Sequence, residues 1–164
     1  MAKTAGILVI GNEILSGKTR DENSTFLSQE LRALGVDVRR ISVIPDELGI
    51  IAEEVRGFAT AYDYVFTTGG VGPTHDDLTM DGIAMAFNQR ISRNPHLETT
   101  VRQLYPGDIL APNLRMADIP EGARLIGEGM SFPVVAIRNV FTFPGVPEIL
   151  QRKFDRIKEM FREA

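Results

Sequence analysis

Short apolar runs alternate with amphipathic segments through the first half of the chain, and this alternation constrains the fold more than any other feature. Residues 5–10, 36–44 and 64–66 are rich in apolar, β-branched or aromatic side chains and read as strands. The segments between them carry apolar residues on one helical face, at Leu27, Leu31 and Leu34 and then at Ile51, Val55 and Phe58. Strands joined by single helices through short loops form right-handed crossovers and lie parallel. The sequence therefore predicts an α/β three-layer sandwich with a mainly parallel central sheet.

Flanking residues indicate where these elements begin and end. The first helix is expected to be capped by Asp21 or Asn23 and to end at Gly35. The second strand carries Arg39 and Arg40 in succession, which breaks its apolar alternation. This interruption favours a position at the edge of the sheet for that strand.

The second half of the chain is less regular. Residues 96–105 are expected to form a helix, and residues 106–120 a long loop with one helical turn at 113–117. Three later runs read as short strands, of which the last two are expected to pair as a small β-hairpin: 124–126, 133–137 and 140–143. A final helix presents four apolar residues to the core: Leu150, Phe154, Ile157 and Phe161. Because no repeat, low-complexity tract or linker is visible, residues 1–164 are expected to form a single domain.

Composition narrows the class of protein. The 164 residues include no cysteine, which excludes disulfides and thiolate metal sites. The formal net charge is −4 without a long basic run, so neither nucleic acid nor an anionic membrane is an expected partner. The apolar run near the N-terminus is too short for a signal peptide or a membrane span. The expected location is therefore cytoplasmic.

The most informative motif joins the strand at 64–66 to a helix expected at 78–87. Residues 67–79 read TTGGVGPTHDDLT, a glycine-rich loop that ends in carboxylates. Gly69, Gly70 and Gly72 permit positive φ and let a ligand approach the backbone, so several N–H groups can converge on an anion. The N-terminus of the following helix adds unpaired donors and the positive end of its dipole. The pattern favours a phosphate-binding site.

The carboxylates in this loop allow two interpretations. Asp76 and Asp77 would repel a phosphate directly, so as functional groups they are best explained as ligands of a Mg²⁺ ion that bridges to it. Alternatively, Asp76, Asp77 and Thr79 only cap the helix. His75 is a candidate general base, because histidine is the side chain most often used for proton transfer in catalysis, although a histidine beside two carboxylates also pairs with them.

Four segments resemble, in order and spacing, the MoaB/Mog molybdopterin-binding family: GNEILSG at 11–17, DEN at 21–23, the loop at 67–79 and FPGVP at 143–147. The resemblance covers nearly the whole chain and is strongest to the amino-terminal domain of the competence/damage-inducible protein CinA and to the similar domain of eukaryotic FAD synthases. It implies a domain that binds a phosphorylated pterin or nucleotide at the carboxyl ends of its parallel strands, often as a trimer. Open α/β sheets bind ligands at that edge in general.

The resemblance also implies individual site residues. The phosphate-binding loop is matched by Thr68, Gly69, Gly70, Gly72 and Thr74, and the Asp-x-Thr that closes it by Asp77 and Thr79. Asp77 is then the preferred catalytic carboxylate and Mg²⁺ ligand, with Asp76 second. Further positions that the family places around the site are matched by Gly11, Glu13, Asp21, Pro144, Gly145 and Pro147, with Asp21 as an additional metal ligand. Without the resemblance, Glu13 reads equally as a solvated charge and residues 144–147 as a turn before a helix.

Two classes of function are compatible with these features. The first is a domain that binds molybdopterin or a related phosphorylated pterin or nucleotide with a divalent metal, in molybdenum cofactor metabolism. The second is a metal-dependent nucleotide pyrophosphatase that acts on ADP-ribose or FAD, and a binding module without turnover is a third reading. A homo-oligomer, most simply a trimer, is expected, with Leu110, Phe132 and Pro133 as exposed-looking candidates for its contacts.

Overall fold

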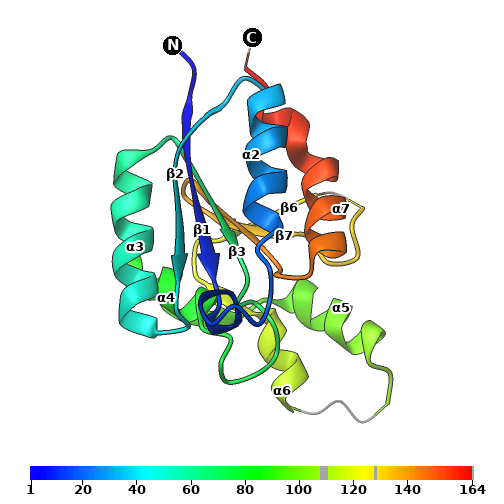
Figure 1. Cartoon of the computed structure of the whole chain (residues 1–164). Coiled ribbons are helices and arrows are strands. Elements are labelled where there is room, and N and C mark those ends of the chain that lie inside the picture. The colour runs from blue at the N-terminus through cyan, green and yellow to red at the C-terminus, as the bar shows by residue number, and fades with distance from the viewer. Residues whose placement is uncertain (108–110, 128, 164) are drawn as a thin grey trace.

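The computed structural model of the chain describes residues 1–107, 111–127 and 129–163 (Figure 1). Its strands are β1 Thr4–Ile10, β2 Asp37–Ile44, β3 Tyr64–Thr68, β4 Ile91–Arg93, β5 Asp118–Pro120, β6 Arg124–Ile126, β7 Val134–Ile137 and β8 Val140–Phe143. Its α-helices are α1 Asn12–Leu15, α2 Asn23–Ala33, α3 Leu48–Ala61, α4 Thr79–Ala86, α5 Pro95–Leu104, α6 Ala111–Leu114 and α7 Pro147–Ile157. Two 3₁₀ turns complete the list: η1 Arg115–Ala117 and η2 Lys158–Phe161.

The main sheet has the strand order β2-β1-β3-β8-β7-β6. The pairs β1/β2, β1/β3 and β3/β8 are parallel, whereas β7 pairs antiparallel with both β8 and β6. The predicted mainly parallel sheet and the hairpin at 133–143 are thus confirmed, and β2 lies at the edge as its two arginines indicated. Arg138 turns the hairpin with a φ of 51°.

Helices cover both faces of this sheet, which gives the predicted three layers (Figure 1). On one face α2 and α7 bury a core that is rich in phenylalanine, in which Phe66 packs edge-on to both Phe154 and Phe161. On the other face Ile51 and Val55 of α3 pack with residues of β1, β3 and α4. Alternate residues of each buried strand feed the two cores, so the strands are apolar throughout, as central parallel strands are.

The register of the sheet brings several loops to one edge. Thr68 at the end of β3 lies opposite Val9 of β1 and Phe143 of β8. Beyond these pairs the backbones stay joined, because Gly69 donates its N–H to Phe143 O at 3.0 Å and Gly11 donates to Ile44 O at 3.0 Å. The loops after β1, β2, β3 and β8 therefore meet at the carboxyl ends of the parallel strands.

A second, two-stranded antiparallel sheet of β4 and β5 was not predicted. β5 lies in the segment that was expected to be a loop, and no element was assigned to the residues of β4. With α5 and η1 the two strands enclose a small core around Leu97, Val101 and Ile119. Asn94 caps α5 through the N–H of Leu97, with Pro95 in the first turn. Figure 1 shows α5 and α6 beneath the carboxyl end of the main sheet. In the described ranges, no helix is both long and apolar enough to span a bilayer.

Candidate functional site

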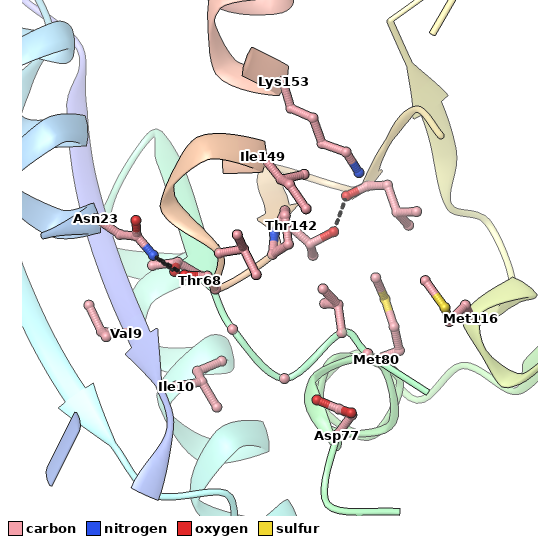
Figure 2. A pocket seen from close by; sticks show the side chains of 18 of the residues that line it. Val9, Ile10, Asn23, Thr68, Asp77, Met80, Met116, Thr142, Ile149 and Lys153 are labelled. Atoms are coloured by element: carbon pink, nitrogen blue, oxygen red, sulfur yellow. Dashed lines mark hydrogen bonds between the residues drawn. The ribbon is translucent and has the colours of Figure 1, made fainter. Parts of the chain in front are cut away.

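A pocket of about 820 Å³ opens at the edge where these loops meet, which is a typical volume for a small-molecule site. Its walls come from β1, β3 and β8, from the loops that follow them, and from α4 and α7 (Figure 2). Most predicted site residues line it: Glu13, Asp21, Thr68, Gly69, Gly70, Gly72, Asp77, Pro144, Gly145 and Pro147. The remaining predicted residues are outside its lining: Gly11, Thr74, Asp76 and Thr79.

The glycines of the loop are required by the fold itself. Gly69 and Gly70 have φ of 97° and 69°, which disfavours any side chain. A Cβ at Gly69 would lie 2.2 Å from Ile10 O, and one at Gly70 would lie 2.2 Å from Thr79 Oγ1. A side chain at Gly70 would therefore face Thr79 and strain the fold, besides any effect on a ligand.

Thr79 sets the direction of the loop's peptide groups. Its buried hydroxyl donates to Gly69 O at 2.9 Å, and its N–H donates to Gly70 O at 3.0 Å. In a trans peptide the N–H points opposite to the C=O, so the N–H groups of Gly70 and Val71 point away from Thr79. Together with the N–H of Gly72 they donate to no described residue. Three backbone donors on the pocket wall are thus available to an anion.

Asp77 stabilises the turn in front of α4 rather than the helix itself. Its Oδ2 accepts hydrogen bonds from the Thr74 N–H at 2.9 Å and from the Thr74 hydroxyl at 2.8 Å. The residue before α4 is Leu78, and no side chain caps that end. The capping alternative for Asp76 and Asp77 is therefore not what the structure has. Figure 2 shows the Asp77 carboxylate at the pocket.

His75 and Asp76 lie at the surface of the same loop. The His75 imidazole and Asp76 carboxylate are 3.4 Å apart, and their side chains are 92% and 80% exposed. Neither lines the pocket. The second reading of His75, a pairing with neighbouring carboxylates, is the one that the geometry supports.

Further carboxylates lie around the glycine loop, of which Glu13 and Asp77 line the pocket and Asp46 and Asp76 do not. Asp46 lies in the loop after β2 and forms two hydrogen bonds with Asn12. The backbone N–H of Asn12 donates to Asp46 Oδ2, and the backbone N–H of Asp46 donates to Asn12 Oδ1. Burial raises the pKa of Asp46, the Asn12 N–H lowers it, and the negative charges of Glu13, Asp77 and Asp76 raise it further. This mutual influence places the four carboxylates in one field of negative potential, which a cation would relieve.

Asp21 has a structural role in addition to its place in the pocket. Its carboxylate accepts hydrogen bonds from the N–H and the hydroxyl of Ser24 in the first turn of α2. It therefore supports the start of that helix from one residue before the N-cap position. That position is occupied by Glu22 and has no side-chain cap, so neither Asp21 nor Asn23 is the predicted cap itself.

The carboxylates of the pocket are better suited to a cation that also binds a ligand than to one that is enclosed by protein groups alone. No group of three or more Asp, Glu or His side chains in the described ranges is arranged to hold a metal ion. Mg²⁺ is commonly held by only one or two carboxylates together with phosphate oxygens and water. Asp77 meets this need, because its Oδ1 accepts no hydrogen bond from a described residue.

Asn23 was predicted only as a helix cap, yet it links two loops of the site. From the first turn of α2 its side-chain NH₂ donates to Thr68 Oγ1 and to Gly145 O, both at 2.9 Å. Asn23 is only 7% exposed, and its Oδ1 has no partner among the described residues. The proline-glycine loop at 144–147 is thus held against the end of β3. Figure 2 shows the hydrogen bond between Asn23 and Thr68 as a dashed line.

Arg115 was missed because it lies in the segment that was expected to be a loop. From η1 its guanidinium donates to Thr74 O, to Asp77 O at 3.0 Å and to Asp81 Oδ2 at 3.1 Å. The second small sheet and its helices therefore hold the far side of the glycine loop in place. The sequence signal was slight, since one arginine in an irregular stretch has no periodic context.

Lys153 and Phe132 form another part of the pocket that the sequence did not reveal. Lys153 extends from α7 into the pocket, and its Nζ lies 4.8 Å from the centre of the Phe132 ring. The sequence predicts an exposed contact surface at Phe132 and Pro133, and this is wrong. Pro133 is buried, and Phe132 is only partly exposed because it packs against the small core. Both residues line the pocket. Leu110, the third member of that group, lies outside the described residues.

Comparisons with known proteins agree with this geometry. A "Probable FAD synthase" of Caenorhabditis elegans is 42% identical over 96% of the chain, and a "CinA-like protein" of Thermotoga neapolitana is 34% identical over 98%. The chain spans only 35% and 41% of these two relatives. The crystal structure of a protein CinA with unknown function from Thermoplasma acidophilum matches with a TM-score of 0.90 at 29% identity, covering 98% of this chain and 100% of that one.

A more distant structure, the molybdopterin biosynthesis enzyme MoaB of Thermus thermophilus, matches with a TM-score of 0.61 at 18% identity, over 95% of this chain and 89% of that one. It supports the fold alone. A family model described as "Probable molybdopterin binding domain" matches residues 6–163. With nearly the whole chain inside that match, and with the glycine loop and proline-glycine loop in contact at one pocket, the chain belongs to the molybdopterin-binding domain family of the MoaB/Mog type and is related to CinA and to the corresponding FAD synthase domains.

Proposed function

We propose that the pocket binds a phosphorylated pterin or nucleotide, with a phosphate at the Gly70–Gly72 backbone. The observation that carries this proposal is the set of free N–H groups at Gly70, Val71 and Gly72, of which the first two are oriented by the two hydrogen bonds of Thr79. Backbone donors at the end of a parallel strand are a recurrent solution for phosphate. Molybdopterin is the candidate ligand that the family's description supports, and molybdenum cofactor metabolism is then the process in which this domain takes part.

A divalent ion, Mg²⁺ in the simplest case, is part of this proposal. A phosphate placed at Gly72 would be close to Asp77, since a Cβ on Gly72 would lie 2.8 Å from Asp77 Oδ2. The two negative groups would repel each other unless a cation lay between them. Asp77 would hold that ion, with Asp21 as the predicted further ligand in the pocket lining. Asp76, the other predicted ligand, lies outside the lining with its side chain 80% exposed and is left out of this proposal.

A second candidate activity is metal-dependent hydrolysis of a diphosphate such as ADP-ribose or FAD. The carboxylates of Glu13, Asp46 and Asp77 favour it, because they would concentrate a divalent ion beside the backbone donors. Water attacks one phosphorus, the bond to the bridging oxygen breaks, and that oxygen leaves with the electron pair while the water loses a proton. The loop's N–H groups would stabilise the charge that develops on the phosphoryl oxygens.

One set of incubations separates these functions. The protein is mixed with molybdopterin, ADP-ribose or FAD, with Mg²⁺, Mn²⁺ or Co²⁺ or with a chelator, and products and retained ligand are measured. Chelation is expected to eliminate hydrolysis and only to weaken retention of a pterin phosphate. Retention of molybdopterin in chelator without hydrolysis in any metal would leave the binding function alone, whereas failure to retain any of the three ligands would contradict the proposal.

Asp77→Asn tests the role of the carboxylate in the same assays. The amide oxygen can still accept the Thr74 N–H, so we expect a cost to folding below about 1 kcal/mol. Metal-dependent turnover or metal-enhanced binding should be lost. A variant that responds to Mg²⁺ like the natural protein would reduce Asp77 to a turn-forming residue. Asp76→Asn, at an exposed position of the same loop, is the matched control.

A further inference from the structure

Lys153 is a cation in the pocket without a carboxylate partner among the described residues. It lies on α7, less than two turns after Pro147, and Figure 2 shows its side chain extending from the helix into the pocket. Its ammonium lies over the face of the Phe132 ring, and in the described ranges it forms no ion pair. Arg115, another cation of the lining, is in contrast paired with Asp81 at 3.1 Å.

The surroundings of Lys153 are apolar. Burial lowers the pKa of Lys153 to about 8, so at neutral pH it is still charged but poorly solvated. Keeping an ammonium in such a place is unfavourable unless a hydrogen-bond acceptor reaches it. Because no described side chain supplies that acceptor, a bound ligand is the natural source.

The pocket has two chemically different ends. The glycine-loop end holds the free backbone donors and the carboxylates of Glu13, Asp21 and Asp77. The lining near Lys153 is apolar, with Phe132 beneath the ammonium and with Met80 and Met116 packed in the same small hydrophobic cluster as Phe132. Figure 2 shows Lys153 and Asp77 on opposite sides of the pocket, with the two thioethers in the region between. Methionine sulfur and aromatic faces pack well against flat rings.

We propose that Lys153, Phe132, Met80 and Met116 form a ring subsite that selects heteroaromatic rings carrying a carbonyl oxygen. The ammonium donates to that oxygen while the apolar side chains cover the ring. A ring with an exocyclic amino group at the same position presents a donor to a donor and is disfavoured. This inference rests on the proposed function for the placement of the ligand's phosphate at the other end of the pocket.

Inosine monophosphate and adenosine monophosphate are matched probes for this subsite. They share a purine, a ribose and a phosphate, and at ring position 6 the first has a carbonyl where the second has an amino group. Each is titrated calorimetrically at pH 7 with Mg²⁺ into the natural protein and into Lys153→Met, which keeps most of the length of the side chain without its charge. Lys158→Met is the control, because Lys158 pairs with Asp155 outside the pocket and its loss changes the net charge equally.

The natural protein and Lys158→Met are expected to bind inosine monophosphate more tightly than adenosine monophosphate. Lys153→Met should lose about tenfold in affinity for inosine monophosphate and change less than about twofold for adenosine monophosphate, since a hydrogen bond to a charged donor is at stake. Equal losses for both nucleotides would mean that Lys153 attracts the shared phosphate, and no loss for either would mean that it contacts neither ring; both results overturn the ring subsite. If the natural protein binds neither nucleotide, the proposed phosphate site itself fails and the ring subsite falls with it.

Discussion

Gly70 illustrates how a residue can be essential to a site for a reason other than space for the ligand. Its φ of 69° disfavours a side chain, and a Cβ at this position would lie only 2.2 Å from Thr79 Oγ1. Thr79 lies this close because it donates hydrogen bonds to Gly69 O and Gly70 O. These bonds direct the N–H groups of Gly70 and Val71 away from Thr79. A glycine here is therefore a requirement of loop geometry first and of binding second.

We expect Gly70→Ala to lower the free energy of unfolding by about 1–3 kcal/mol. Denaturant unfolding measures the loss, and Gly57→Ala is the control, since Gly57 lies in α3 with open space around a Cβ and should gain stability. In a Thr79→Ala background the cost of Gly70→Ala should shrink, because the colliding hydroxyl is gone. Strictly additive costs would mean that the Thr79 contact is not the cause.

Lys153 has a measurable cost in the ligand-free protein. Its pKa is about 8 in the folded chain against an ordinary 10.5. The charged side chain therefore lowers the free energy of unfolding by about 3 kcal/mol at most. Below pH 8 both states bind the proton and the full cost applies. Between pH 8 and 10.5 only the unfolded state keeps the proton, so this residue makes stability rise with pH.

Lys153→Met should accordingly raise the free energy of unfolding at pH 7 by about 1–3 kcal/mol, and its advantage over the natural protein should narrow as pH rises from 8 to 10.5. Thermal or urea unfolding over that range measures the difference. Lys158→Met should show no such gain, because Lys158 forms an ion pair with Asp155 at 2.8 Å. A constant difference between Lys153→Met and the natural protein at every pH would mean that Lys153 does not titrate in this window.

At the scale of elements, periodic patterns were sufficient for the main sheet and its covering helices. Leu27, Leu31 and Leu34 do pack on the sheet, and the arginines of β2 do mark its edge. The three-residue strands β4 and β5 were missed because runs so short carry no period to read. Their pairing is set by tertiary contacts, which no local pattern records.

The site could be predicted only where a motif is contiguous. The loop from Thr67 to Thr79 is such a motif, and Asp77 does lie at the pocket. Lys153 was not predicted, because beside the apolar stripe of α7 it looks like an ordinary solvated lysine. Arg115 and Asn23 act on loops more than 35 residues away in sequence, so their roles depend on the assembled fold.

The segment from α6 to β5 has a role that can be tested through Arg115. Its guanidinium bonds hold two carbonyls of the 74–77 turn, and Arg115→Met would leave them without these donors while keeping much of the side chain's volume. We expect amide hydrogen exchange in residues 70–78 to accelerate and affinity for phosphorylated ligands to fall about tenfold. Arg93→Met, which breaks the exposed pair with Asp118 in the same small sheet, is the control. Unchanged exchange in Arg115→Met would show that the loop is rigid without this clamp.

For the whole molecule, the position of Phe132 and Pro133 changes the argument about assembly. Because they line the pocket, they are not available for contacts between copies. Other large apolar side chains of the described chain are exposed, among them Ile41 of β2, Met85 of α4 and Tyr105 after α5. Leu104, Val146 and Ile149 are exposed as well, but they line the pocket. We expect an oligomer to bury residues of the first group, so that assembly and ligand binding use different surfaces.

We therefore expect a trimer whose formation leaves the site unchanged. Light scattering at micromolar concentration should give three times the 18.1 kDa of the chain. The residues of a single chain already enclose a pocket of about 820 Å³, so we expect ligand affinity to stay constant when the protein is diluted until the measured mass falls. A monomer mass at micromolar concentration would reject the trimer. An affinity that falls together with the mass would instead mean that a neighbouring copy completes the site, since a pocket built within one chain has no reason to respond to dilution.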